Sequence, residues 1–239
     1  MTTAVVVQAR IGSSRLPGKI LMPLRSKTVL EEVLRRCHAI PGADIVVCAI
    51  PDGPEDDPLV PVVERAGAVV TRGPVQDVLA RYLAAAEAVT ADIVMRVTSD
   101  CPLIDPQLCG KVLTMRAAEN ADYACNNMPP SFPHGLDCEA FATKALRRAA
   151  TEAKKPEERE HVTPWLRTAS DLRRANVVGP GGDATRHRWT LDYAEDYTFL
   201  SRLFALLPPA PAIPSWRDVV DLLAARPELA AINTMHRTR

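Results

Sequence analysis

The 239-residue sequence predicts an α/β protein with a doubly wound, mostly parallel sheet. Strand-like and helix-like segments alternate from residue 4 to residue 120, an order that favours right-handed crossovers between parallel strands. The segment DIVVCAI at 44–50 is apolar on both faces, as is typical of a parallel strand covered by helices on both sides of the sheet. Both observations point to the same fold class.

The first half of the chain supplies the regular elements. Strands are expected at 4–9, 44–50, 68–71 and 92–98, and helices at 28–40, 58–67, 75–89 and 106–120. The helix at 28–40 places its apolar residues Val29, Leu30, Val33, Leu34 and Cys37 on one face, the spacing of a helix that packs against a core.

From about residue 121 the alternation loosens, and an irregular α+β second half is expected. Strands are predicted at 122–127, 135–142 and 186–192, and helices at 142–153, 156–169 and 216–226. A proline-rich connector at 207–216 precedes the last helix. Because no repeat or low-complexity tract divides the chain, we expect one continuous domain over residues 1–239.

Composition excludes several classes of function. Lys plus Arg and Asp plus Glu number 29 each, so the chain lacks the basic field of a nucleic-acid-binding protein and no nucleic-acid partner is expected. No apolar run approaches the ~20 residues of a membrane span, and the N-terminus lacks a signal-peptide pattern. A cytoplasmic protein without a membrane partner is therefore expected.

Six cysteines are scattered without a C-x-x-C pair. That spacing predicts neither a zinc site nor a disulfide framework in a domain of this size. We interpret them as buried small hydrophobic residues. Cys101 is the exception of interest, because it lies inside a polar motif.

The first strand is followed by the polar segment QARIGSSRLPGK at 8–19. Small residues allow a ligand to approach the backbone, and the cations indicate an anionic ligand. The segment is not a phosphate loop of the G-x-x-x-x-G-K-[ST] type. Gly12 and Gly18 are one residue too far apart, and Ile20 stands where the metal-binding hydroxyl would be.

Two acidic residues also follow predicted strands. Asp100 comes just after the strand at 92–98, and Asp192 ends the predicted strand at 186–192. Ligands of open α/β sheets bind beyond the carboxyl ends of the strands, and Mg²⁺ prefers one or two carboxylates with phosphate oxygens and water. The combination predicts a metal–polyphosphate site. Taken singly, an aspartate in a loop before a helix is more often an N-cap than a ligand, so the prediction depends on the combination.

An ordered set of motifs resembles the CMP-sugar-acid synthetases, the cytidylyltransferases that activate KDO and sialic acids. The resemblance is closer still to the branch named after the spore-coat polysaccharide biosynthesis protein SpsF. It rests on QARIGSSRLPGKIL, TVLEEVLRRC, PVQDVLARY, RVTSDCPLIDP, HGLDCEAF, EREHVTPW and WTLDYAEDY, which run from residue 4 to about residue 200. It implies a Rossmann-like sheet of the nucleotide-diphospho-sugar transferase type.

The resemblance implies that the first loop wraps the triphosphate of CTP. Arg10 and Lys19 would hold phosphate oxygens, and Asp100 and Asp192 would bind Mg²⁺, with Arg10, Lys19 and Asp100 as the catalytic residues. The implied nucleotide-binding residues are Gln8, Ala9, Arg10, Gly12, Ser13, Arg15, Lys19, Arg72, Asp77 and Thr98. Thr98 stands where the KDO and sialic acid enzymes have a glutamine that reads cytosine.

The later motifs are assigned to the second substrate. The candidate acceptor-binding residues are His134, Asp137, Glu139, Glu160 and His161. Structural alternatives stay open for three residues: Asp77 could cap the helix that follows it, and His134 and His161 could be hydrogen-bonded structural histidines. Residues 1–120 are thus expected to form a nucleotide-binding half, and residues 121–239 an acceptor-binding and dimerisation half.

The resulting hypothesis is a Mg²⁺-dependent cytidylyltransferase that transfers CMP from CTP to an acidic sugar and releases pyrophosphate, in surface polysaccharide or glycoconjugate biosynthesis. The acceptor implied is a 2-keto sugar acid, with a phosphate or phosphonate compound as the alternative. A glycosyltransferase-like nucleotide-sugar protein would typically carry a D-x-D motif, which SDCPLID lacks. A non-catalytic nucleotide-binding module is the third class.

A homodimer is also expected. The family commonly dimerises through its second half, and residues 121–170 carry the aromatic residues Tyr123, Phe132, Phe141 and Trp165. Aromatic side chains are enriched at the centres of interfaces, although ordinary core packing explains them equally well.

Overall fold

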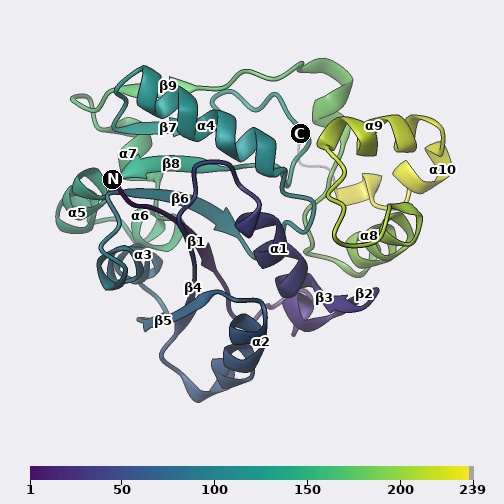
Figure 1. Ribbon diagram of the computed structural model, residues 1–239, viewed down its shortest axis with the longest axis horizontal. Helices are drawn as coiled ribbons and strands as arrows, with labels where there is room; N and C mark the ends of the chain where they lie inside the picture. Colours follow the sequence, from purple (N-terminus) through teal and green to yellow (C-terminus); the bar gives the residue numbers. More distant parts are fainter. Residues whose placement is uncertain (237–239) are drawn as a thin grey trace.

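A seven-stranded sheet forms the centre of the computed structural model, which describes residues 1–236 (Figure 1). The strands lie in the order β5 (Val69–Gly73), β4 (Ile45–Pro51), β1 (Thr3–Gln8), β6 (Ile93–Thr98), β8 (Glu139–Ala142), β7 (Tyr123–Cys125) and β9 (Arg174–Asn176). Neighbouring strands pair in parallel, except that β8 runs antiparallel to both β6 and β7. The predicted α/β class with a mostly parallel sheet is confirmed.

Helices cover both faces of the sheet because its strands are apolar on both faces. In β1, Val5 and Val7 pack in one core and Ala4 and Val6 in the other. The first core is shared with α1 (Val29–His38), α2 (Val60–Arg65) and α4 (Pro106–Ala118). The second core is shared with α3 (Val78–Ala88), α5 (Thr143–Glu152) and α7 (Pro164–Thr168).

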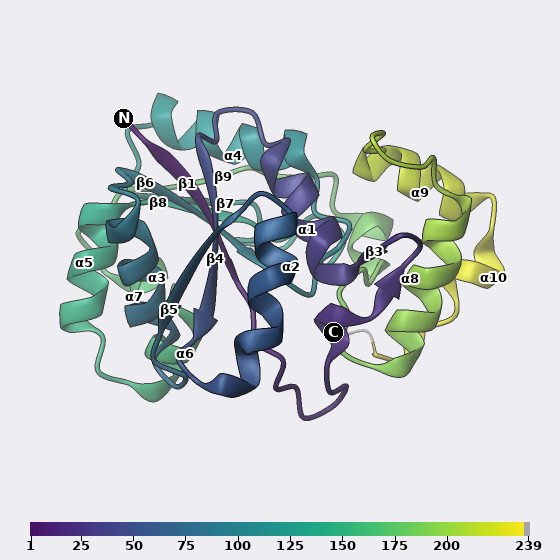
Figure 2. The ribbon, with the colours of Figure 1, turned by 60° about the horizontal axis from the view of Figure 1, so that its bottom comes forward.

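A third hydrophobic cluster lies beside the sheet. It contains the helices α8 (Ala194–Leu206), α9 (Trp216–Ala224) and α10 (Pro227–Ala230), which Figures 1 and 2 show grouped at one end of the molecule. Trp189 and Leu191 are fully buried in this cluster. The cluster therefore anchors the segment that leads to Asp192.

Two predicted elements of the second half are wrong, and one strand was not predicted. Residues 186–192 form no named strand, because Trp189 N–H donates to the carbonyl of His134 and Leu191 N–H to that of Asp100, both in loops. The predicted helix at 156–169 is divided into α6 (Pro156–His161) and α7, since Val162 has a φ of 70°. The sequence analysis also missed β9, whose three residues are half-buried and show no apolar pattern.

The aromatic argument for a dimer interface is wrong for two of its residues. Tyr123 and Phe141 are fully buried and stack on each other within the second core. Phe132 packs edge-on against Trp216. Core packing, the alternative explanation, accounts for these side chains.

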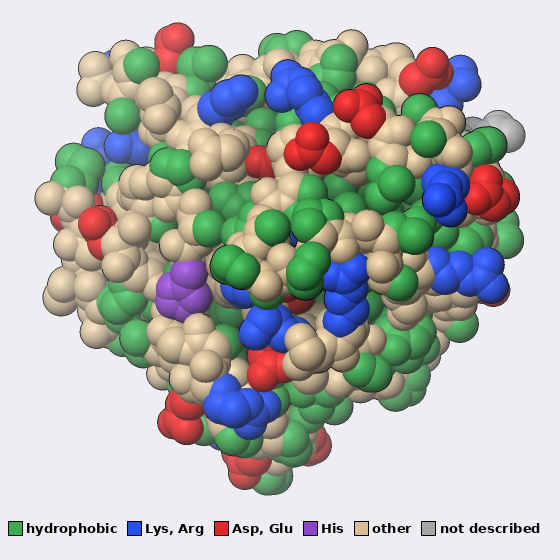
Figure 3. Space-filling model, turned by 45° about the vertical axis from the view of Figure 1, so that its right-hand side comes forward, with side chains coloured by type: hydrophobic (Ala, Val, Ile, Leu, Met, Phe, Trp, Pro, Cys, Tyr) green, Lys and Arg blue, Asp and Glu red, His purple; other side chains and the backbone are tan. Residues whose placement is uncertain are grey.

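The small β-hairpin of β2 (Pro23–Leu24) and β3 (Lys27–Thr28) precedes α1. Figure 3 shows basic and acidic side chains interspersed over one face of the molecule, in keeping with the equal numbers of the two charges. Within residues 1–236, no helix has the length and apolar character that crossing a membrane requires.

Candidate active site

The carboxyl ends of β1 and β6 mark the point where the sheet changes direction. Gln8 and Thr98 are paired at these ends, with β4 and β5 to one side and β8, β7 and β9 to the other. Such a switch point is where open α/β sheets bind ligands. A cavity of about 260 Å³ lies there. The predicted site residues that line it are Gln8, Ala9, Arg10, Gly12, Ser13, Arg15, Lys19, Thr98, Asp100, Glu160, His161 and Asp192.

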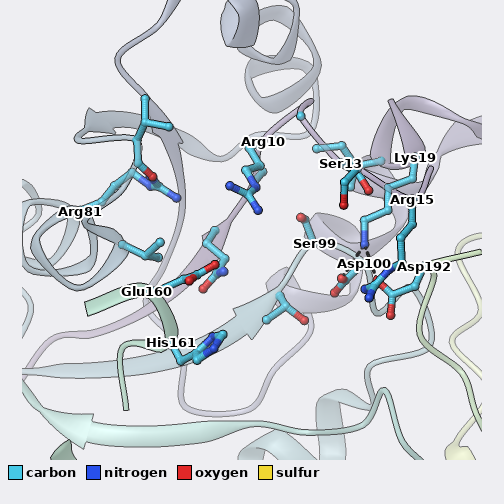
Figure 4. Close-up of a pocket in the computed structure, with 18 of the residues that line it drawn as sticks. Arg10, Ser13, Arg15, Lys19, Arg81, Ser99, Asp100, Glu160, His161 and Asp192 are labelled. Atoms are coloured by element: carbon cyan, nitrogen blue, oxygen red, sulfur yellow. Dashed lines mark hydrogen bonds and ion pairs between the residues drawn. The ribbon is translucent and has the colours of Figure 1, made fainter. Parts of the chain in front are cut away.

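One end of this cavity holds a cluster of acidic and basic side chains (Figure 4). Lys19 Nζ donates to Asp100 Oδ2 at 2.8 Å, to Asp192 Oδ1 at 3.0 Å and to the carbonyl of Leu191 at 2.7 Å. Arg15 also pairs with Asp192 Oδ1, at 2.8 Å. The fold thus brings residues 19, 100 and 192 to one point, as predicted, although Asp192 follows a loop and not the predicted strand.

Backbone hydrogen bonds explain why the two aspartates meet. Leu191 N–H donates to the carbonyl of Asp100 at 2.9 Å, so the 190–192 segment is tied directly to the turn that follows β6. Lys19 reaches the same point because it begins a 3₁₀ turn, Lys19–Leu21, after Gly18, whose φ is 69°. A residue with a side chain rarely adopts that conformation, which favours glycine here.

A second layer of polar residues holds Asp192, and the sequence analysis missed it. Arg188 Nη2 donates to Asp192 Oδ2 at 2.9 Å and its Nε donates to the fully buried Asp196 at 2.9 Å. Asn233 donates to Asp196 as well, at 2.8 Å. Asp196 in turn accepts the backbone N–H of Asp192. The i, i+4 and i, i+8 spacing of these charges was visible in the sequence, but the strand predicted at 186–192 gave no reason to pair Arg188 with Asp192 or Asp196.

The cluster is charged at neutral pH. Burial alone would lower the pKa of Lys19, but the carboxylates of Asp100 and Asp192 raise it above its ordinary value. Burial opposes ionisation of Asp192, but Lys19, Arg15 and Arg188 outweigh it and hold the pKa of that carboxyl well below its usual range. An opposite charge at this distance favours the charged form of both partners.

The donor set fits a divalent cation that is shared with a ligand. Oxygens of Asp100 and Asp192 both contact the single ammonium of Lys19, so one cation can reach both carboxylates. Within the described residues, no group of three or more His, Cys, Asp or Glu side chains could hold a metal by itself. Two carboxylates completed by phosphate oxygens and water are the set that Mg²⁺ prefers.

Two hydrogen bonds from backbone N–H groups fix the loop between β1 and Lys19. Ile11 N–H donates to Asp56 Oδ1 at 2.6 Å, and Gly18 N–H donates to the carbonyl of Ile11 at 3.2 Å. Arg10 projects into the cavity between the two ends (Figure 4). Among the described residues, its side chain makes no hydrogen bond or ion pair, so its guanidinium is available to a ligand.

A second cavity, of about 450 Å³, adjoins the first through His161, which lines both. Its floor is the buried carboxylate of Glu139, which accepts from Arg96 and from Arg167, each at 2.7 Å. Burial opposes ionisation of Glu139, but these two arginines lower its pKa below the ordinary value. Two guanidinium groups against one carboxylate leave this cavity with an excess of positive charge.

Four predicted site residues are not brought to either cavity. Arg72 pairs with Asp57 and donates to the carbonyl of Pro51. Asp77 caps α3 by accepting from Ala80 N–H at 2.9 Å, and it also pairs with Arg159. The remaining two, His134 and Asp137, lie in the loop before β8 and line neither cavity.

These four side chains have structural partners instead. His134 contacts Arg188, and its backbone bonds to residues 187 and 189. Asp137 accepts from Asn127 Nδ2 and from Gly135 N–H. The contacts of Asp77 are those of a helix cap, and the contacts of His134 are those of a hydrogen-bonded structural histidine.

Cys101 is not a nucleophile in this arrangement. Its side chain is buried, and burial together with the neighbouring Asp100 raises the pKa of the thiol well above its ordinary value. Its sulfur contacts the hydroxyls of Thr98 and Thr190. The described structure leaves all six cysteines as buried free thiols, as the sequence predicted.

A cationic loop and paired carboxylates at the switch point of a parallel sheet define an α/β enzyme that handles nucleotide phosphates. The profile of one family, described as Cytidylyltransferase, matches residues 4–204. Since the match covers most of the chain, this protein belongs to the cytidylyltransferase family and is a nucleotidyltransferase.

Individual relatives agree with the family. The chain is 29% identical to the spore coat polysaccharide biosynthesis protein SpsF of Bacillus subtilis over 232 residues, 94% of this chain and 95% of that protein. It is 38% identical to a 3-deoxy-manno-octulosonate cytidylyltransferase of Maricaulis maris over 122 residues, 49% of this chain and 46% of that one. A cytidylyltransferase structure from Leptospira borgpetersenii superposes with a TM-score of 0.91 at 28% identity, covering 96% of this chain and 97% of the other.

Proposed function

We propose that this cytidylyltransferase transfers CMP from CTP to an acidic sugar, a 2-keto sugar acid, with Mg²⁺ as cofactor and release of pyrophosphate. The observation that carries the proposal is the contact of Lys19 with both Asp100 and Asp192 at the switch point of the sheet. The similarity to SpsF supports a role in surface polysaccharide biosynthesis.

The reaction requires an acceptor oxygen to bond to the α-phosphorus while the bond from that phosphorus to the β-phosphate oxygen breaks. Pyrophosphate leaves with the bonding electrons, and the acceptor hydroxyl loses its proton. The protein's contribution to such transfers is mainly positioning and charge neutralisation. Bound at Asp100 and Asp192, Mg²⁺ would supply Lewis-acid polarisation of the α-phosphate.

The basic residues divide the remaining work. Lys19, a compact cation, is placed to contact phosphate oxygens beside the two carboxylates. Arg15 pairs with Asp192 at the outer side of the same cluster and is half-exposed, so we assign it to the departing pyrophosphate. Arg10 projects between this cluster and the rest of the cavity, and its planar fork suits a phosphate that gains charge as the bond breaks.

The second cavity is assigned to the acceptor. Arg96 and Arg167 outnumber Glu139 on its floor, so an anionic group on the acceptor would balance the charge. His161 lines both cavities and Glu160 lines the first, and we place both close to where the acceptor hydroxyl would approach the nucleotide. The similarity to a 3-deoxy-manno-octulosonate cytidylyltransferase supports a sugar acid there.

A pyrophosphate-release screen tests the proposal. The four common nucleoside triphosphates are combined with Mg²⁺ and with a panel of 2-keto sugar acids, sugar phosphates and phosphonates. We expect release with CTP and a sugar acid. Release only with a phosphate or phosphonate acceptor would overturn the acceptor assignment, and release with UTP alone would overturn the nucleotide assignment.

A homodimer stays a prediction, and it now rests on the family resemblance without the buried aromatic residues. Light scattering at micromolar concentration should give twice the 26.0 kDa mass of one chain. A monomeric mass would contradict it.

A further inference from the structure

One buried arginine of the cavity has not been assigned. Arg81 lies on α3 and lines the first cavity with only 2% of its surface exposed. In Figure 4 it stands at the opposite end from Lys19, Asp100 and Asp192, with Arg10 between them. It belongs to the motif PVQDVLARY, in which the sequence analysis selected Asp77 instead.

Arg81 differs from the other buried arginines in its partners. Arg36 is buried with Glu32 at 2.8 Å, and Arg188 is buried with Asp196 at 2.9 Å. Within residues 1–236, Arg81 has no ion pair: Nη1 donates to the carbonyls of Pro74 and Val75, at 2.7 and 3.4 Å. Its buried Nε has no acceptor at all.

Burying a guanidinium without a carboxylate partner costs free energy, because its donors lose hydrogen bonds to water and do not regain an equal number in the protein. Burial lowers the pKa of Arg81, and the nearby charge of Arg10 lowers it further. The side chain is nevertheless held in place. A Cβ on Gly73 would come within 3.1 Å of Arg81 Cγ, so the strand end packs directly on the arginine stem. This is a fixed donor group that lacks its acceptor.

We propose that Arg81 reads the cytosine base, by donating from the guanidinium to O2 and N3. The inference rests on the proposed function, in which the nucleotide is CTP. Cytosine presents O2 and N3 as adjacent acceptors, whereas uracil presents a donor N3–H beside O2. A guanidinium has donors only, in a planar fork. It therefore matches cytosine and leaves one donor facing another in uracil.

The position of Arg81 favours the base over the phosphates. The phosphate end of the cavity is defined by Lys19 and the two aspartates, and Arg81 lies at the other end. Val75 and Val78 line the cavity beside it and offer apolar surface to a base. Thr98, at the position of the family's cytosine-reading glutamine, has its hydroxyl in contact with Cys101 Sγ at 3.2 Å.

The first test uses the wild-type enzyme alone. Calorimetry with Mg²⁺ compares CTP with UTP and with 3-deaza-CTP, which lacks the N3 acceptor. A good bidentate contact discriminates by roughly 10- to 100-fold, so both analogues should bind weaker by about that factor. If CTP is preferred to UTP but 3-deaza-CTP binds as tightly as CTP, the inference about Arg81 fails while the proposed function stands.

The second test uses Arg81→Gln, with the exposed Arg147→Gln on α5 as the matched control. We expect Arg81→Gln to lose the preference for CTP over UTP and Arg147→Gln to keep it. A thermal melt shows whether Arg81→Gln is folded, and if it is not, the 3-deaza-CTP result decides. A folded Arg81→Gln that keeps the full preference would overturn the inference. A wild-type enzyme without any preference for CTP would instead refute the nucleotide of the proposed function.

Discussion

The cations at the two ends of the first cavity differ in whether they have carboxylate partners. At one end, Lys19 and Arg188 are neutralised by Asp100, Asp192 and Asp196. Toward the other end, Arg10 and Arg81 face the cavity without an ion pair among the described residues. At the first end the cations already have carboxylate partners in the protein, whereas the other end lacks acceptors that a ligand can provide.

This difference separates stability from binding. A cation with a carboxylate partner contributes to the folded state, because removal of the partner leaves a buried charge uncompensated. A cation that has no carboxylate partner contributes little to the stability of the folded state and is available to bind an anionic ligand. Variants of the two kinds should therefore respond differently in unfolding and in turnover experiments.

The largest expected effect is on stability, at the buried ion pairs of Glu139 in the second cavity. Glu139→Gln removes the carboxylate shared by Arg96 and Arg167, and loss of one partner of a buried ion pair costs on the order of 3–5 kcal/mol. Urea unfolding measures the change. The control Glu87→Gln removes an exposed pair with Arg147, worth about 0–1 kcal/mol. Equal losses for the two variants would contradict the distinction.

The next effect is on turnover. Arg10→Ala should reduce pyrophosphate release by roughly 10²–10³, the usual result of removing a preorganised electrostatic partner. Its melting temperature should stay that of the wild type, because Arg10 is exposed and makes no ion pair within the described residues. Arg186→Ala, which also alters an exposed arginine, is the control.

Lys19→Ala should lose turnover similarly. If both cations bind one triphosphate, the loss of transition-state stabilisation in the double variant Arg10→Ala/Lys19→Ala should be smaller than the sum of the losses in the two single variants. Near wild-type turnover in a folded Arg10→Ala enzyme would show that the loop does not bind the triphosphate.

A smaller effect concerns the pH dependence of stability. The pKa of Asp192 is lowered in the folded protein, so its contribution is present above the ordinary aspartate value of about 3.9. That contribution is lost as the pH falls below this value toward the lowered pKa. Asp192→Asn should therefore reduce stability near pH 7 by about 1.5–3 kcal/mol. The difference from wild type should shrink as the pH falls below 4.

Unfolding curves of the wild type and of Asp192→Asn at pH 7 and at pH 3 measure the difference in stability at each pH. Asp183→Asn, at an exposed pair with Arg186, should differ little from wild type at either pH. A deficit of Asp192→Asn that stays constant between the two pH values would contradict the ion-pair explanation.

Much of the first half could be predicted from the sequence because its elements are local. The strands and helices up to α4 follow an apolar period, and the polar residues fall where that period stops. The rule that strand ends share an edge of the sheet placed Asp100 and the loop after β1 correctly, whereas Asp192 reaches the same point from a loop that is bonded to Asp100.

The second half resisted prediction because its backbone hydrogen bonds go to loops and its charges to distant partners. The backbone N–H groups of Trp189 and Leu191 donate to the carbonyls of His134 and Asp100. The spacing of apolar residues in the sequence does not indicate such contacts. Asp77 and Arg72 looked like ligands, yet their partners Arg159 and Asp57 lie elsewhere in the chain. Arg81 was overlooked because the absence of a carboxylate partner is a property of the folded structure.

We expect the carboxylates that hold Lys19 to form the metal site for the nucleotide. Calorimetric titration of CTP, with and without Mg²⁺, tests it most directly in wild type, Asp100→Asn and Asp192→Asn. We predict that Mg²⁺ strengthens CTP binding to the wild-type enzyme and that either substitution removes most of this gain. A gain from Mg²⁺ that is the same in all three proteins would contradict the claim.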